Sequence, residues 1–173
     1  MQERTLENLI LDGEDYIFAG DLTIEGDVIL KNASLIVSGE LCFPNNFTTI
    51  SITGGNILAE TLSSYATITI RDGDICVSYL DTSDIDSDSN IEVSKDSNVS
   101  DISCLNYEVS GDSNSHTINA IQDVFILGYS DSDSITARDV LIGCDCNLHS
   151  MPLTAKSFEC QGEIINCYSM SIG

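Results

Sequence analysis

Carboxylates are the most densely spaced reactive side chains in this sequence. Seven of them fall within twenty-one residues, with Lys95 the one cation among them: Asp81, Asp84, Asp86, Asp88, Glu92, Asp96 and Asp101. Oxygen ligands at Asp84, Asp86 and Asp88 could hold Ca²⁺. The segment lacks the glycine and the distal glutamate of an EF-hand loop, and Ile85 interrupts its polarity. We therefore keep a calcium-binding protein as a second alternative and expect no metal site and no cofactor.

The whole chain is acidic as well. Twenty-eight Asp and Glu against six Lys and Arg give a net charge of -22, whereas a magnitude of about 2 to 8 keeps a small domain soluble. One explanation is local, because Asp, Asn and Ser stabilise turns by bonding the nearby backbone. Another is that the carboxylates imitate a nucleic-acid duplex, which carries one negative charge per about 1.7 Å. The same sign of charge excludes direct binding of nucleic acid.

Histidines and cysteines offer no convincing alternative chemistry. His116 and His149 do not adjoin a Ser or Cys nucleophile motif, and the sequence has no phosphate loop, no HExxH and no GxGxxG after a strand. The seven cysteines are an odd number without a basic leader, which argues against a disulfide framework. Cys144 and Cys146 would share one face near Cys160 and Cys167, but their spacing is not that of zinc knuckles. We predict a protein that is not an enzyme, with cysteines in the core.

A repeat can bring the acidic residues together. The hexapeptide VSKDSN at 93–98 returns sixteen residues later as VSGDSN at 109–114. Intervals of 16, 16, 17, 16 and 18 separate apolar residues that mark successive copies: Ile75, Ile91, Tyr107, Val124, Val140 and Phe158. Runs this short, rich in Ile, Val and Leu and bounded by Gly, Asn, Asp and Ser, indicate strands. The period predicts an all-β, single-domain parallel β-solenoid of about nine rungs, each of about 16 to 18 residues.

Short strands must pair in parallel one period away to bury an apolar column. Such a rod would be roughly 40 Å tall, with an insertion at residues 43–47. A β-sandwich is the second choice of fold, because it also has short strands at even spacing. We expect an N-terminal cap at residues 1–12, in which Leu6, Leu9 and Ile10 form one face of a short helix or lead strand that covers the first rung, and the solenoid at 13–173. The end at 168–173 shows no polar cap, which suggests a contact with a second copy.

Stacking would place the acids in vertical ladders. We expect Asp96 and Asp112 on one corner, with Asp81 below and Asp131 and Asp133 above; Asp123 and Asp139 form another pair. Carboxylates about 5 Å apart repel each other, so such ladders oppose folding and point to a function. No segment approaches the roughly 18 apolar residues of a membrane span, and no basic leader precedes an apolar run, so we place the protein in the cytoplasm.

Residues 18–30 and 135–143 contain Gly-Asp punctuated rungs, FAGDLTIEGDVIL and ITARDVLIG. In these stretches the chain resembles the bactofilins, bacterial β-helix proteins that form polymers. The resemblance implies a right-handed β-helix without an enzyme site that associates end to end. The Asp and Ser density of residues 81–133 departs from that pattern, and like-charged rods repel laterally. In acidity the chain is similar to pentapeptide-repeat mimics of DNA, without their five-residue period.

These observations favour a non-catalytic acidic protein that occupies the basic, nucleic-acid-binding surface of a partner, as an anti-defence or immunity protein would. A bactofilin-like self-assembling scaffold is the first alternative. The residues expected to bind the partner are Asp81, Asp84, Asp86, Asp88, Asp96, Asp101, Asp112, Asp131 and Asp133.

Overall fold

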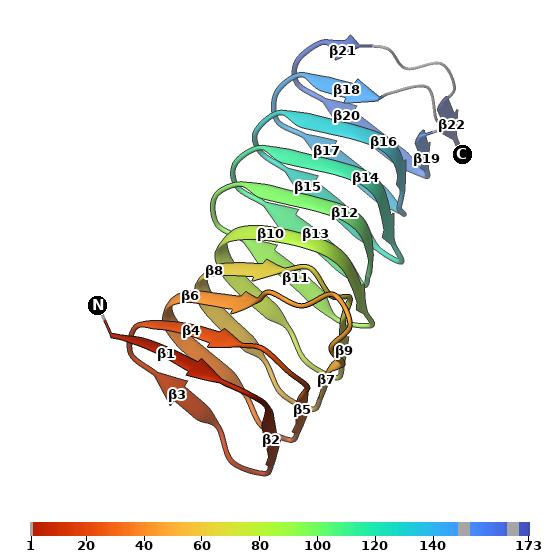
Figure 1. Ribbon diagram of the computed structural model, residues 1–173. Helices are drawn as coiled ribbons and strands as arrows, with labels where there is room; N and C mark the ends of the chain where they lie inside the picture. Colours follow the sequence, from red (N-terminus) through yellow and green to blue (C-terminus); the bar gives the residue numbers. More distant parts are fainter. Residues whose placement is uncertain (1, 149–152, 166–169) are drawn as a thin grey trace.

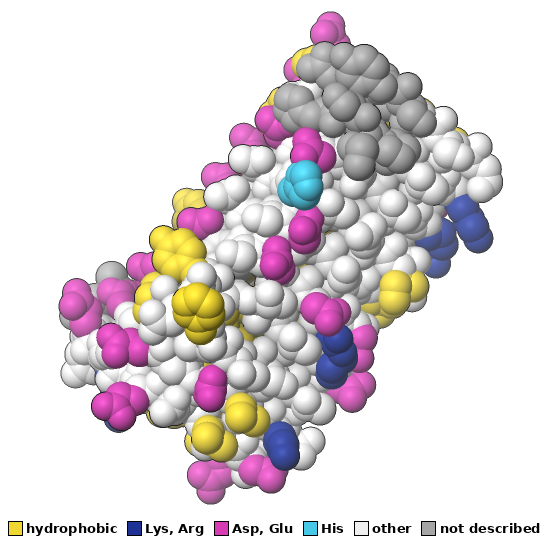
Figure 2. Space-filling view, turned by 45° about the vertical axis from the view of Figure 1, so that its right-hand side comes forward, with side chains coloured by type: hydrophobic (Ala, Val, Ile, Leu, Met, Phe, Trp, Pro, Cys, Tyr) yellow, Lys and Arg dark blue, Asp and Glu magenta, His cyan; other side chains and the backbone are white. Residues whose placement is uncertain are grey.

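The chain folds as a rod of stacked turns (Figure 1). The computed structural model describes residues 2–148, 153–165 and 170–173. In these residues the regular elements are all strands, and they pair in parallel with strands of the next turn, about nine turns in all. The predicted parallel β-solenoid is therefore confirmed, and the β-sandwich is wrong. Figure 2 shows the same rod in a second view, with acidic side chains spread along it.

Each turn has three sides, which we call A, B and C in chain order. Side A holds β3 (Tyr16–Phe18), β11 (Asn90–Val93), β13 (Asn106–Val109), β15 (Asp123–Ile126), β17 (Asp139–Ile142), β20 (Ser157–Cys160) and the beginnings of β6 (Leu35–Phe43), β8 (Ile57–Ser64) and β10 (Ile75–Ser87). Side B holds β1 (Glu3–Leu6), β4 (Asp21–Ile24), β18 (Cys146–Leu148), β21 (Ile164–Ile165), the first halves of β12 (Ser97–Cys104), β14 (Ser113–Ala120) and β16 (Ser130–Thr136), and later residues of β6, β8 and β10. Side C holds β2 (Leu9–Asp12), β5 (Val28–Lys31), β7 (Ile50–Thr53), β9 (Ile68–Arg71), β19 (Leu153–Ala155), β22 (Met170–Ile172) and the ends of β10, β12, β14 and β16.

Strands that run from side B to side C bend where two neighbouring residues both face outward. In β12, buried and exposed residues alternate except at Ser100 and Asp101, which are both exposed. The pairing of β12 with β14 includes Val99 and Asp101 but omits Ser100. Because alternate residues of a straight strand face opposite ways, this break in the pattern marks a corner.

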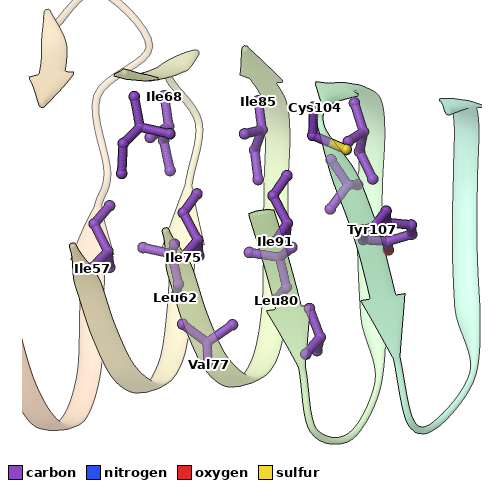
Figure 3. Close-up of a cluster of buried hydrophobic side chains, with 14 of the residues drawn as sticks. Ile57, Leu62, Ile68, Ile75, Val77, Leu80, Ile85, Ile91, Cys104 and Tyr107 are labelled. Carbon is purple, nitrogen blue, oxygen red and sulfur yellow. The ribbon is translucent and has the colours of Figure 1, made fainter. Parts of the chain in front are cut away.

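The apolar residues used as period marks stack directly on one another. Ile75 pairs with Ile91, Ile91 with Tyr107, Tyr107 with Val124, Val124 with Val140, and Val140 with Phe158. Figure 3 shows part of this column in the core, where Ile57, Ile75, Ile91 and Tyr107 are each at most 1% exposed. Burying each aliphatic side chain contributes about 1.5 to 3 kcal/mol. The repeat period of the sequence is therefore the spacing between inward-facing residues of side A on successive turns.

The interior of side B changes character along the rod. One column of its inward residues is apolar in the lower turns and consists of Leu22, Leu41, Leu62 and Leu80. From the next turn onward this column continues as Ser97, Ser113 and Ser130. The buried Tyr107 hydroxyl donates to Ser97 Oγ at 2.6 Å and lies 3.2 Å from Ser113 Oγ. Ser115 and Ser132 bond each other at 2.9 Å, so these buried hydroxyls find partners inside the rod. The buried hydroxyls of Tyr16 and Thr82 have no hydrogen-bond partner among the described residues.

Residues 3–12, where we expected a cap, form two strands of the same sheet. Strand β1 pairs with β4 and β2 pairs with β5, both in parallel. The stacking therefore begins at Glu3, and residue 12 marks no change of structure. The expected insertion lies between β6 and β7, where Thr49 bonds Asp27 across 22 residues. The described residues contain no helix that is long and apolar enough to cross a lipid bilayer.

Candidate functional site

The outward surface of side B carries three vertical files of polar side chains. The tyrosine file lies at the corner between sides A and B and contains Tyr79, Asp96, Asp112, Tyr129 and Asp145. Backbone bonds fix this order, since the amides of Leu80, Ser97, Ser113 and Ser130 donate to the carbonyls of Asp96, Asp112, Tyr129 and Asp145. The asparagine file runs along the middle and contains Asp81, Asn98, Asn114, Asp131 and Asn147. The histidine file lies at the corner with side C and contains Ser83, Ser100, His116 and Asp133.

Side B is hollowed between these files. The tyrosine and asparagine files line a hollow of about 460 Å³ that reaches from Tyr79 to Tyr129. The asparagine and histidine files line a second hollow of about 270 Å³, which shares Asn98, Asn114 and Asp131 with the first. Figure 2 shows Asp and Glu side chains, together with a histidine, in a line along the rod. A concave surface with converging polar groups is the default candidate for a binding site.

Carboxylates of the tyrosine file also hold the turns together. Oδ1 of Asp96 accepts the backbone N–H of Asp112 at 3.0 Å, and Oδ1 of Asp112 accepts that of Tyr129 at 2.8 Å. Asp145 accepts the N–H of Glu163 at 2.7 Å. Turn chemistry thus accounts for an oxygen acceptor at each of these corners.

Turn chemistry does not account for the charge. At the corner between sides C and A, Asn56 Oδ1 accepts the N–H of Asp74 at 2.8 Å, and Asn106 Oδ1 accepts that of Asp123 at 3.1 Å. An amide oxygen therefore makes the same kind of bond at another corner of the turn without a negative charge. The carboxylates of the tyrosine file add charge that the fold does not require.

The nine aspartates expected to bind a partner do not form one ladder. Asp81 belongs to the asparagine file, and Tyr79 occupies the place below Asp96 where Asp81 was expected. The reason is the length of that turn. Asp81 bonds Asn98, which lies 17 residues further along the chain and therefore stands directly above it. Asp96 is only fifteen residues from Asp81 and stands above Tyr79 instead. Asp131 and Asp133 likewise stand in two different files. Five of the nine lie together on side B: Asp81, Asp96, Asp112, Asp131 and Asp133.

The remaining four lie beyond side B. Asp84 and Asp101 pair on successive turns just past the bend, at the start of side C. Asp86 bonds Arg71 at 2.6 Å on side C. Asp88 accepts the backbone N–H of Asp72, a bond that lowers the pKa of its carboxyl group. These four residues are therefore a poor choice for the centre of a binding site.

Cations gather at the opposite corner, between sides C and A. Asp123 and Asp139 pair on successive turns as expected, and Arg138 bonds both, at 2.7 and 2.9 Å. The pKa of the Asp139 carboxyl is lowered first by the Ser157 hydroxyl, which bonds it at 2.6 Å, and then by Arg138. Lys95 lies next to the tyrosine file, with its Nζ 4.5 Å from the ring centre of Tyr79. Side B thus presents acids while Arg71 and Arg138 neutralise acids elsewhere.

Sequence reasoning missed the aromatic members of this site. The aligned segments SYLD, KDSN, GDSN and GYSD place Tyr79 and Tyr129 at the position held by Asp96 and Asp112 in the turns between them. The sequence shows this exchange of Asp for Tyr when the repeats are aligned on Leu80, Ser97, Ser113 and Ser130. Reading the acids alone hid it.

In the described residues, no group of three or more His, Cys, Asp and Glu side chains is placed to hold a metal ion. Asp84 and Asp86 lie on a strand, and Ile85 between them is buried in the core. Cys144 and Cys146 were expected to share one face, and this prediction is wrong. Cys144 is exposed in the turn before β18, whereas Cys146 is fully buried. Cys167 and His149 lie outside the described residues. Burial raises the pKa of the Cys104 thiol to about 12.

No protein-family model, curated protein sequence or solved structure matches this chain. The function is therefore argued from side B itself.

Proposed function

We propose that this protein is a non-catalytic acidic binding protein that occupies the basic, nucleic-acid-binding surface of a partner protein. The observation that carries the proposal is the hollowed side B, where Asp81, Asp96, Asp112, Asp131 and Asp133 converge around the two hollows. The cations that neutralise acids on other sides, Arg71 and Arg138, do not reach it. A basic partner would compete there with His116, which bonds Asp133, and with Lys95, which lies over the ring of Tyr79.

The spacing of charge on side B approaches that of one nucleic-acid strand. Four steps between turns separate Tyr79 from Asp145, a length of about 19 Å at 4.8 Å per turn. Six carboxylates lie along it, the five named above and Asp145, which gives about one charge per 3 Å; a single strand of duplex DNA has one per about 3.4 Å. The site would replace about six base pairs of phosphates on one strand.

Hydrogen bonds also hold three of these carboxylates in place. Backbone amides hold Asp96 and Asp112, and the side-chain amide of Asn98 donates to Asp81 at 2.9 Å. Such bonds fix carboxylates before a partner arrives, so that less side-chain entropy is lost on binding. Electrostatic attraction would then make association fast and sensitive to salt.

Ser100, His116 and Asp133 stand on successive turns of one file, and these residue types form the catalytic triad of many hydrolases. A hydrolase is therefore an alternative functional class. His116 Nδ1 bonds the Asp133 carboxylate, as the histidine of a catalytic triad does. No hydrogen bond joins the described Ser100 hydroxyl to His116, and the turns are about 4.8 Å apart. A nucleophile that its base does not reach is not activated.

The test is a competition experiment with a panel of basic DNA-binding proteins, each bound to a fluorescent duplex. The protein should displace the duplex from at least one of them at about 50 mM salt and much less at about 200 mM. The variant D96N/D112N/D131N should lose this displacement, since asparagine keeps the Oδ1 acceptor and removes the negative charge. The control E92Q/E108Q/E159Q changes the net charge equally on side A and should displace as the wild type does. No displacement from any panel member, or equal loss in both variants, overturns the proposal.

The scaffold alternative makes a different demand. A bactofilin-like protein should form filaments whose length grows with concentration, visible by negative-stain microscopy and light scattering. Filaments that still form in D96N/D112N/D131N would favour assembly over the binding of a basic partner.

A further inference from the structure

A cation of the protein itself lies beside Tyr79, which lines the lower end of the larger hollow. Lys95 extends over the ring of Tyr79, with Nζ 4.5 Å from the ring centre and 3.5 Å from Glu60 Oε1. Tyr79 and then Glu60 raise the pKa of the Lys95 ammonium. The lower end of the hollow therefore shows how an aromatic ring and a carboxylate together receive an ammonium group at this surface.

The upper end of the hollow has a second ring in the same file, with carboxylates of the file itself in place of Glu60 and without the lysine. Tyr129 stands in the same file as Tyr79, with Asp112 one turn below and Asp145 one turn above. Lys95 immediately precedes the residue stacked above Tyr79; the equivalent residue for Tyr129 is Cys144, which precedes Asp145. The chain thus places a ring between two carboxylates at Tyr129 and supplies no positively charged side chain at the matching position.

The surface between the two tyrosines is open along one flank. The residues that continue the Lys95 position upward are Gly111 and Gly128, whose amides bond the carbonyls of Lys95 and Gly111. Neither has a side chain that could cover the hollow. A Cβ on either would come within 2.3 Å of an atom of the turn below, so glycine is required where the turns pack so closely.

We propose that this hollow binds an extended, lysine- or arginine-rich segment of the partner along the rod axis, with one cationic side chain stacked on Tyr129 between Asp112 and Asp145. The inference rests on the proposed function and names the chemistry of its partner. Three turns separate Tyr79 from Tyr129, about 14 Å, and four residues of an extended peptide span about 13 Å. Side chains four residues apart in such a segment reach both ends of the hollow, and Lys95 competes for the lower one.

The probe for this proposal is a fluorescent octapeptide of alternating arginine and serine, with an octapeptide of alternating glutamine and serine as the neutral control. Binding is measured by fluorescence polarisation at about 50 mM salt, where exposed charges are weakly screened. Tyr129→Ala should weaken binding about threefold, the size of an exposed cation–π contact. Tyr129→Phe keeps the ring and should bind as the wild type does.

The internal lysine gives a test in the opposite direction. Lys95→Gln should tighten binding about threefold, because it frees Tyr79 as a second cation site. Lys31→Gln removes the same charge from side C and serves as the matched control. Circular dichroism checks that each variant is folded. Equal tightening by both lysine variants, or no difference between Tyr129→Ala and Tyr129→Phe, overturns the proposal.

These outcomes are separate from those of the proposed function. A wild-type protein that displaces duplex DNA but does not bind the arginine octapeptide rejects the extended segment and keeps the acidic decoy. Peptide binding with the expected variant pattern, combined with no displacement of DNA, supports the hollow as a site for basic segments and rejects the decoy role.

Discussion

Asp96 and Asp112 lie one above the other at a corner of the solenoid, and the backbone amide of Asp112 donates to the carboxylate of Asp96 at 3.0 Å. We expected stacked aspartates to oppose folding through their repulsion. The structure shows that this hydrogen bond opposes the repulsion, since an N–H bond to a charged acceptor contributes about 1.5 to 3 kcal/mol. A ladder of acids at such a corner therefore serves the fold and the surface charge together.

Asp112→Ala and Asp112→Asn separate the two roles. Alanine removes the acceptor for the N–H of Tyr129 and should lower the free energy of unfolding by about 1 kcal/mol or more. Asparagine keeps the Oδ1 acceptor, and the relief of repulsion from Asp96 offsets the weaker bond to a neutral acceptor, so its stability should stay close to that of the wild type. Urea unfolding followed by circular dichroism measures both. If asparagine destabilises as much as alanine, the corner bond is not what holds Asp112.

The period of the sequence predicted the stacking well because the marks were inward residues. Ile75, Ile91 and Tyr107 must lie over one another for the apolar column to close, so their intervals give the register of side A directly. Outward residues carry no such constraint. Asp81 was placed in the wrong file because corners absorb the variation in turn length, which the spacing of buried residues does not reveal.

Serine was equally ambiguous in the sequence. The DSN repeats indicate turns by composition, yet Ser97 and Ser113 lie inside the rod, at 4% and 1% exposure. What allows this is a tyrosine on the facing side, whose hydroxyl lies within bonding distance of both. The partner of each buried hydroxyl is set by packing across the interior, which no local sequence pattern encodes.

Tyr107→Phe tests that interior contact. The change deletes the hydroxyl that joins Ser97 and Ser113 and leaves polar atoms without a partner in the core, which costs about 1 to 3 kcal/mol. Tyr65→Phe is the control, because Tyr65 is 68% exposed and its loss of a hydroxyl should change stability little. Chemical denaturation of both variants gives the comparison. Equal stability of Tyr107→Phe and wild type would mean that Ser97 and Ser113 satisfy each other.

Stability should fall in alkaline solution. Burial raises the pKa of the Cys104 thiol from 9.0 to about 12 and that of the Tyr107 phenol from 10.0 to about 12. Between the ordinary and the raised pKa the unfolded chain binds fewer protons than the folded one, so the free energy of unfolding decreases as pH rises. Each group contributes about 1.4 kcal/mol per pH unit within its window. Tyr107→Phe should make the decline less steep above pH 10, and Cys104→Ala should do so from pH 9.

Ester hydrolysis that depends on Ser100 should be absent despite the file of Ser100, His116 and Asp133. The wild type and Ser100→Ala should release p-nitrophenol from p-nitrophenyl acetate at the same rate, because His116 does not bond the serine hydroxyl. His116→Gln should differ only by the modest catalysis that any exposed imidazole provides. A rate that drops tenfold or more in Ser100→Ala, which corresponds to about 1.4 kcal/mol, would establish a nucleophile.

The asparagine file explains how side B tolerates its charge. Asp81 and Asp131 are separated by Asn98 and Asn114, so no two acids of this file are on neighbouring described turns. Asn98→Asp would place a carboxylate about 5 Å from that of Asp81, with a repulsion of about 1 to 3 kcal/mol at surface dielectrics, and would remove the bond that Asn98 donates. Thermal unfolding should show a loss of stability at low salt that shrinks as salt is added. Glu92→Gln on side A should show no such salt-dependent loss, and a loss in Asn98→Asp that salt does not reduce would assign it to the missing hydrogen bond alone.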